Sequence, residues 1–191
     1  MHDEVDFEQL LAGARAGEEW AWSELYRRLA PGVLGYLRAR GAADPEDLLG
    51  ECFLQVVRDL ERFSGSESDL RAWIFTIAHH RAVDDLRHRA RRPVSPASGE
   101  RLAELGPVGN AEDEALRALG DASVREALRA LTEDQRTVLF LRLLAGLSIE
   151  EVATVMGKRT GAVKALQHRA VGAVRRVLDA GDGRGGNPAG S

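Results

Sequence analysis

The stretch ALTEDQRTVLFLRLLAGLSIEEVATVMGKRTGAVKALQHRA, residues 130–170, decides the fold because helix starts and helix ends follow one another closely in it. Thr132 with Gln135 matches the capping box, in which two side chains satisfy unpaired N–H groups at a helix start. Ser148 with Glu151 repeats this pattern, and Gly157 suits the left-handed turn that ends a helix. The predicted helices run from Thr132 to about Ala145, from Ile149 to Met156 and from Thr160 to about Leu178.

The last two of these helices, with the glycine between them, match the helix-turn-helix pattern. Such a motif places the first residues of its second helix against base edges in the DNA major groove. Their small core would contain Val152, Ala153, Met156, Val163 and Leu166. The residues expected at the DNA are Lys158, Arg159, Thr160, Ala162, Lys164, Ala165, Gln167, His168 and Arg169. A plain three-helix bundle with a basic surface is the alternative that the residues alone leave open.

The rest of the chain is also predicted to be helical, which gives an all-α fold. Ala, Leu, Arg and Glu dominate, and the alternation typical of strands is missing. Pro31 is expected to kink or split its helix. The four N-terminal helices are predicted at about 7–16, 18–40, from 44 onward and 69–89. Two small helical domains are expected, 1–92 and 113–179, with a flexible Pro- and Gly-containing linker at 93–112 and a disordered tail at 180–191.

The composition limits the classes of protein that this sequence can represent. A hydrophobic content of 44% is typical of a globular chain. The single cysteine, Cys52, excludes an internal disulfide, and its apolar helix predicts a buried, unreactive thiol. Neither a signal peptide nor an apolar run long enough to span a membrane is found, so we expect a cytoplasmic protein without membrane insertion.

The formal net charge of −4 conceals a separation of charge along the chain. Residues 1–24 carry −6 and residues 44–61 carry −5, whereas residues 71–92 carry +4 and residues 158–178 carry +6. A basic block on one face is typical of a protein that binds a polyanion such as DNA. A solvated helix face is the alternative for either basic block.

Aromatic and basic side chains interleave in LRAWIFTIAHHRAVDDLRHRARRP, residues 70–93. Aromatic rings can stack on unpaired bases while arginines follow the backbone, which suits single-stranded or opened DNA. Trp73 shares the helical spacing of Ile77, which favours a place in the core. A metal site is the alternative, but it would lack further ligands, so no cofactor is expected. Its candidate ligands are His79, His80, Asp84 and His88.

Three segments taken together resemble a known family. The segments are DPEDLLGECFLQVVRDLERF at 44–63, then 70–93, and then, after the linker, 130–170. They resemble the sigma-70 family of bacterial RNA polymerase sigma factors, in particular its small two-domain extracytoplasmic-function group. The resemblance covers about residues 7–178 and implies sigma region 2 in the first domain and region 4 in the second.

This resemblance implies a protein without catalytic chemistry that binds core RNA polymerase, through its beta and beta-prime subunits, and promoter DNA. It also suggests an anti-sigma factor as a partner. The residues implied for docking on the polymerase clamp are Asp47, Leu48, Glu51, Phe53, Leu54 and Val57. Those implied for the promoter −10 element are Ser64, Ser66, Arg71, Trp73, His79, His80, Arg81, Arg87, Arg91 and Arg92. The helix from Thr160 is implied as the reader of the −35 element.

The sequence departs from the family pattern at three places. Ala78-His79-His80-Arg81 stands where Ala-Arg-Asn-Arg is common, Gly50 where Gln is common, and Leu70 where a large aromatic is common. The first and last changes lie at positions that the resemblance relates to the −10 base preference. Gly50 lies at a position that the resemblance relates to a polar contact with the polymerase clamp. Two other functions remain as alternatives, a stand-alone helix-turn-helix regulator and a metal-dependent hydrolase.

Overall fold

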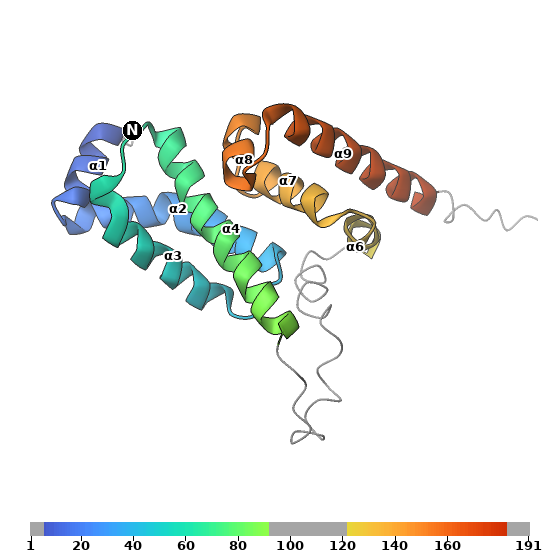
Figure 1. The fold of residues 1–191 in the computed structure, drawn as a ribbon, viewed down its shortest axis with the longest axis horizontal. Helices are drawn as coiled ribbons and strands as arrows, with labels where there is room; N and C mark the ends of the chain where they lie inside the picture. The colour runs from blue at the N-terminus through green and yellow to red at the C-terminus, as the bar shows by residue number, and fades with distance from the viewer. Residues whose placement is uncertain (1–5, 92–121, 183–191) are drawn as a thin grey trace, which may run out of the picture.

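The computed structural model describes residues 6–91 and 122–182 (Figure 1). Every regular element within these ranges is a helix, as predicted. The first unit contains α1 Phe7–Arg15, α2 Glu19–Ala39, α3 Pro45–Asp59, the short 3-10 helix η1 Leu60–Arg62, and α4 Glu67–Arg91. The second unit contains α6 Ala122–Arg129, α7 Glu133–Leu143, α8 Ile149–Met156 and α9 Thr160–Asp182. The linker predicted at 93–112 lies outside the described residues.

Local signals set the helix boundaries of the first unit. Asp44 caps α3 by accepting a hydrogen bond from the Asp47 backbone N–H at 2.9 Å, and Pro45 occupies the first helical position. α4 begins at Glu67, slightly before the predicted start, because the Ser66 hydroxyl accepts from the Asp69 N–H at 3.3 Å. The Asp69 carboxylate in turn accepts from the Ser66 N–H at 2.9 Å.

Pro31 lies inside α2, which continues through it as one helix. The expectation that Pro31 splits this helix is therefore wrong. Pro31 is exposed, so water can hydrate the carbonyl group that loses its hydrogen-bond partner there. The opposite side of α2 lies in the core and contributes Leu25, Val33 and Leu37 to it.

Both capping boxes of the second unit form. Thr132 and Gln135 exchange hydrogen bonds of 2.9 and 3.3 Å, and Ser148 and Glu151 exchange hydrogen bonds of 2.5 and 3.1 Å. Gly157 ends α8 with φ 60°. Helix α9 continues to Asp182, beyond the predicted end near Leu178, so that the first residues of the predicted tail are helical.

The side chains expected in the core are mostly buried. Cys52 is fully buried, and this burial raises the pKa of its thiol to about 11, as expected for an unreactive thiol. Trp73 is only half-buried and stacks on Phe63 with ring centroids 5.5 Å apart. Val83 and Leu86 lie on the apolar side of α4 and are half-buried, because the C-terminal half of this helix extends past the bundle.

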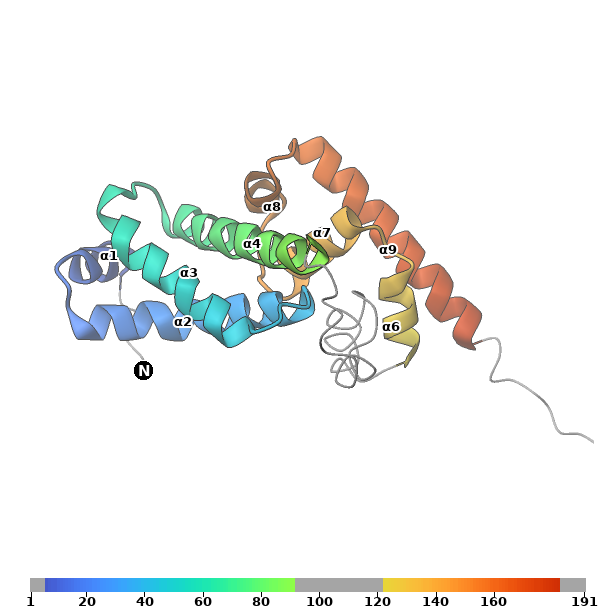
Figure 2. The same cartoon turned by 60° about the horizontal axis from the view of Figure 1, so that its bottom comes forward.

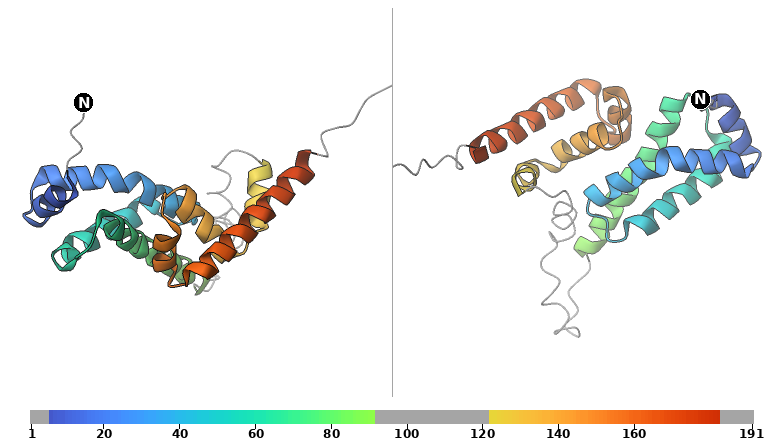
Figure 3. Two further views of the ribbon diagram at one scale, coloured as in Figure 1. Left: turned by 90° about the horizontal axis from the view of Figure 1, so that it is seen from above. Right: turned by 180° about the vertical axis from the view of Figure 1, so that it is seen from behind.

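The two units touch along α4. Helix α8 packs along α4, and α7 contacts α2. Figure 2 shows α7 and α8 next to α4, with α9 on the side away from the first unit. The two views in Figure 3 agree, and they show the C-terminal half of α9 extending beyond the rest of the molecule.

Candidate interfaces with nucleic acid and protein

The predicted recognition helix presents a continuous exposed face. Val163 and Ala170 are fully buried and fix the orientation of α9 on the helices below it. Lys164 and Arg169 are exposed, and the small residues near them permit close approach to a surface. The exposed residues of this face are Gly161, Ala162, Lys164, Ala165, His168 and Arg169. Gln167 and Thr160 are half-buried beside it.

The turn before α9 adds two further cations. Arg159 is exposed, whereas Lys158 is half-buried and its Nζ pairs with an Asp134 carboxylate oxygen at 3.0 Å. Arg175 and Arg176 extend the exposed basic surface further along α9. The face and its turn therefore combine small residues with cations, a composition typical of a helix that enters a DNA major groove.

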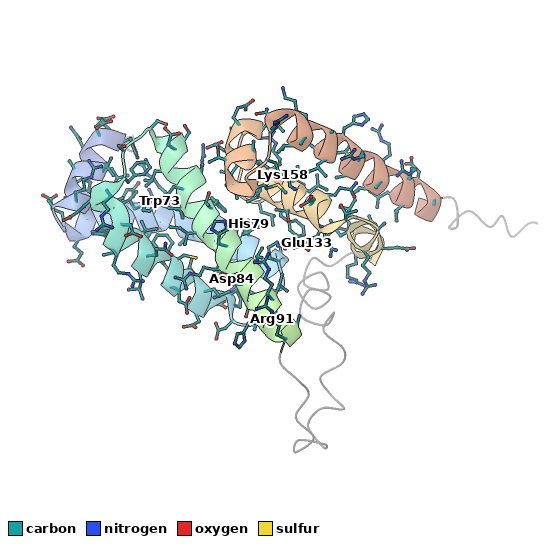
Figure 4. All side chains as sticks on the ribbon, in the orientation of Figure 1. Trp73, His79, Asp84, Arg91, Glu133 and Lys158 are labelled. Carbon is teal, nitrogen blue, oxygen red and sulfur yellow. The ribbon has the colours of Figure 1, made fainter. Side chains whose placement is uncertain are left out.

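The side chains of α4 expected at DNA differ in their surroundings. His80, Arg87 and Arg91 are exposed, and Figure 4 shows Arg91 at the free end of this helix. Arg71 is partly exposed and pairs with Glu151 of α8, with the Nε and Oε1 atoms 3.3 Å apart. Arg92 lies outside the described residues.

His79 lies where the two units meet (Figure 4). Its Nδ1 is 2.8 Å from the hydroxyl of Tyr36, which is fully buried in α2. Burial, followed by the positive charge of Arg40, lowers the pKa of His79 to about 4. His79 is therefore neutral at neutral pH, unlike the arginine that is common at this position of the family.

The turn before α4 is polar and exposed. Ser64 and Ser66 are both accessible, and Gly65 between them has φ 153°. The Ser66 hydroxyl donates to the Asp69 carboxylate at 2.7 Å, and this hydrogen bond lowers the pKa of Asp69. The turn thus presents the Ser66 hydroxyl, which the first residues of α4 hold in place.

The predicted docking face on α3 contains two large exposed apolar side chains. Leu54 is 62% exposed and Val57 is 51% exposed, and Asp47, in the first turn of the same helix, is also exposed. Leu48 and Glu51 are half-buried, and Phe53 is buried. We call Leu54, Val57 and the exposed Tyr26 the apolar docking patch.

Tyr26 was not found by sequence reasoning. It lies on α2, and its ring packs on Phe53 with centroids 4.8 Å apart. Nothing in the spacing of α2 residues predicts that a 49% exposed tyrosine lies beside α3. Only the packing of the two helices brings it there.

Charged side chains connect the docking helix with the predicted DNA helix. Arg81 pairs with Glu51 at 2.5 Å and also donates to the Gln55 amide oxygen at 3.3 Å. The sequence could not separate binding arginines from structural ones. Arg89, in the same basic block, donates to the Gly41 carbonyl at 2.6 Å and pairs with Asp85 at 2.9 Å, so it fastens the end of α4.

The residues of the metal-site alternative lie in two different places. His80, Asp84 and His88 line a groove between α3 and α4. His79 points instead to Tyr36. Among residues 6–91 and 122–182, no group of three or more His, Cys, Asp or Glu side chains could hold a metal ion.

Two protein-family models match this chain, one over each helical unit. The model of sigma-70 region 2 matches residues 25–92, and that of sigma-70 region 4 matches residues 121–174. The ECF RNA polymerase sigma factor BldN of Streptomyces coelicolor is 36% identical over 178 residues, which cover 92% of this chain and 67% of that protein. The ECF sigma factor SigD of Mycobacterium tuberculosis is 33% identical over 183 residues, which cover 91% and 84% respectively.

A solved structure shares the fold. Sigma factor RpoE, in complex with the anti-sigma factor NepR from Bartonella quintana, superposes with a TM-score of 0.61 and 22% identity. The match covers 82% of this chain and 96% of that chain.

The two family matches and these relatives define a bacterial transcription initiation factor, and the chain belongs to the sigma-70 family. Within that family it is an RNA polymerase sigma factor of the extracytoplasmic-function group. Its function is promoter-specific initiation of transcription, with core RNA polymerase and promoter DNA as partners. No helix in the described part of the chain is both long and apolar enough to cross a membrane.

Proposed function

We propose that three separate surfaces carry out this function. The apolar docking patch and the acids of α3 bind core polymerase, the turn at Ser64–Ser66 and α4 bind and open the −10 element, and α9 reads the −35 element. The observation that carries the proposal is that exposed side chains of matching chemistry gather on each surface: apolar and acidic on α3, basic on α4 and α9.

The docking surface has the composition of a protein interface. Exposed Leu54, Val57 and Tyr26 provide the apolar part, and the exposed acids Glu46 and Asp47 lie in the first turn of α3. Apolar and aromatic side chains at the centre with polar groups at the rim are typical of protein contacts. The negative charge of this segment favours a basic partner surface.

The DNA surfaces differ in the form of DNA that they suit. Exposed His80, Arg87 and Arg91 follow one helix and would track a single-stranded backbone. The exposed face of α9 would enter the major groove of duplex DNA instead. Two weak contacts held at a fixed spacing by polymerase act together, because the second contact then becomes intramolecular. We assign no catalytic step to any of these surfaces.

Substitutions in the apolar docking patch test whether this surface binds core polymerase. Leu54→Glu with Val57→Glu places two charges in the centre of the proposed contact, and we expect binding to core polymerase to weaken at least tenfold. Both side chains are exposed, so the thermal stability of the free protein should change little. The measurement is a binding titration with fluorescently labelled protein and core enzyme.

Val171→Glu is the matched control. Val171 is 50% exposed, compared with 51% for Val57, but it lies on α9. It should leave the affinity for core polymerase unchanged. Equal affinities of the docking double variant and the wild type would show that α3 is not the docking helix. The anti-sigma factor suggested by the family resemblance stays a prediction, to be tested by co-purification from cells.

A further inference from the structure

Arg15 links the N-terminal helix to the end of α3 and η1. It is the only Lys or Arg among residues 1–24, which carry −6. From the last turn of α1 its side chain reaches η1, where Nε donates to the Leu60 carbonyl at 3.4 Å and Nη2 donates to the Phe63 carbonyl. Figures 1 and 3 show α1 beside the connection between α3 and α4. One exposed cation therefore joins two backbone groups that lie 45 and 48 residues further along the chain.

The backbone carbonyls that end α3 and η1 depend on donors outside their helices, because the last carbonyls of a helix have no donor within it. The Leu60 carbonyl also accepts from the Phe63 N–H at 3.2 Å, and Phe63 then takes an extended conformation with φ −69° and ψ 137°. A guanidinium group has several N–H donors in one plane, and its charge suits the negative end of a helix. Arg15 thus fixes both carbonyls where the chain leaves η1.

The fixed carbonyls lie at the entrance of the polar turn Ser64–Ser66, since Phe63 is the residue before it. At the exit of the turn, the Asp69 carboxylate holds the last residue through its N–H and its hydroxyl. A Cβ on Gly65 would lie only 2.8 Å from the Asp69 Cβ, so the turn packs closely on α4. The turn is therefore anchored on both sides, by Arg15 before it and by Asp69 after it.

A turn that is anchored in this way distinguishes bases better than a mobile one. Fixing the backbone of one residue costs free energy equivalent to roughly a tenfold change in an equilibrium constant. A turn that is already ordered does not lose this free energy on binding. Contacts to phosphates, which α4 offers through exposed arginines, carry no sequence information. Because only strands whose bases engage the turn gain from its order, that order affects selectivity more than total affinity.

We propose that Arg15 is a positioning residue for recognition of the −10 element. It holds the Leu60 and Phe63 carbonyls so that the turn Ser64–Ser66 meets single-stranded DNA in a preformed conformation. Arg15 acts through the turn rather than by contact with DNA. The inference rests on the proposed function for the identity of the ligand, whereas the order of the turn itself does not depend on that ligand.

The test uses the full chain with Arg15→Ala, which removes both hydrogen bonds. Arg15→Lys keeps the positive charge but not the planar set of donors, so it should restore part of the wild-type behaviour. Arg27→Ala is the matched control, since Arg27 is an exposed arginine whose partner Glu24 lies in the same helix, 2.6 Å away. Circular dichroism checks the fold, and Arg15→Lys carries the test if Arg15→Ala unfolds.

Hydrogen–deuterium exchange of the free protein measures the order of the turn. The relevant amides are those of Phe63 and Ser66, whose N–H groups form hydrogen bonds at the two ends of the turn. In Arg15→Ala we expect these amides to exchange at least about threefold faster, because exchange follows local opening of the chain. Arg27→Ala should exchange as the wild type does. Equal exchange rates in Arg15→Ala and the wild type would overturn the proposal.

A selection experiment measures the effect on recognition. Each protein is assembled with core polymerase and mixed with a pool of short single strands of randomised sequence, and the bound strands are sequenced. Core polymerase alone gives the background. The wild type should enrich a common sequence, and Arg15→Ala should lower that enrichment about tenfold while total binding of the pool changes by less than about twofold. Arg27→Ala should match the wild type.

The two measurements separate this inference from the proposed function. Faster exchange with unchanged enrichment would overturn the part of Arg15 in recognition. A wild-type protein that enriches no sequence would contradict the proposed function of the turn, and with it the part of Arg15 in recognition. Exchange rates would in that case still decide whether Arg15 anchors the turn, because they are measured without DNA or polymerase.

Discussion

At the scale of single residues, His79 makes the stability of the fold depend on pH. Its pKa falls to about 4 on folding, chiefly because burial disfavours the imidazolium ion. Above the unfolded pKa of about 6.5 the residue is neutral in both states and has no effect. Below that pH the unfolded chain binds a proton that the folded chain does not, so His79 lowers stability progressively as the pH falls towards 4.

Urea unfolding at pH 7, 6 and 5 measures this contribution. Between pH 6.5 and 5 the free energy of unfolding should fall less steeply in His79→Gln than in the wild type, because the titrating group is gone. The difference in slope is at most about 1.4 kcal/mol per pH unit. Identical slopes for wild type and His79→Gln would contradict the burial of His79.

Gly157 is the residue on which the turn of the helix-turn-helix depends. At φ 60° a residue with a Cβ is strained, so Gly157→Ala should lower the free energy of unfolding by roughly 1–2 kcal/mol. Gly50→Ala is the control, since Gly50 lies inside α3 with open space around its Cβ position and should gain about 0.5–1 kcal/mol. Thermal or urea unfolding measures the free energy of unfolding of both variants. An unchanged value for Gly157→Ala would argue against the left-handed turn.

At the scale of elements, the sequence predicted helix starts better than helix ends. The capping boxes at Thr132 and Ser148 are local chemistry, so a few residues suffice to place them. The end of α9 carries no comparable signal, and that helix continues past the predicted boundary to Asp182. The prediction that Pro31 splits α2 failed for a related reason. A helix can continue through a proline when the carbonyl group that loses its hydrogen bond faces water, and only the packing of the helix determines this.

Helix α9 also carries the clearest prediction for DNA. Lys164→Ala with Arg169→Ala should reduce transcription from promoters that depend on the −35 element, because each lost base-edge contact costs roughly 1–3 kcal/mol. Arg175→Ala with Arg176→Ala removes the same charge further along the exposed helix and should reduce it less. Run-off assays on promoters with and without a −35 element provide the comparison; equal losses on both promoter types would place the reader elsewhere.

At the scale of the whole molecule, the separation of charge along the chain predicted binding surfaces that the net charge of −4 concealed. It pointed to two basic surfaces and to an acidic helix, and the structure exposes cations on α4 and α9 and acids on α3. Contacts between the units could not be predicted in this way. Arg40, Arg71 and Glu151 meet partners 80 or more residues away in the chain, and no local pattern encodes such pairs.

A sigma factor makes RNA polymerase initiate at particular promoters. Multi-round run-off transcription tests it most directly, with purified core enzyme, the full-length protein and a library of genomic promoter fragments. We expect discrete transcripts from a subset of fragments, absent with core enzyme alone and strongly reduced with the Leu54→Glu/Val57→Glu variant. Transcripts that do not depend on the added protein, or none from any fragment despite binding to core enzyme, would contradict it.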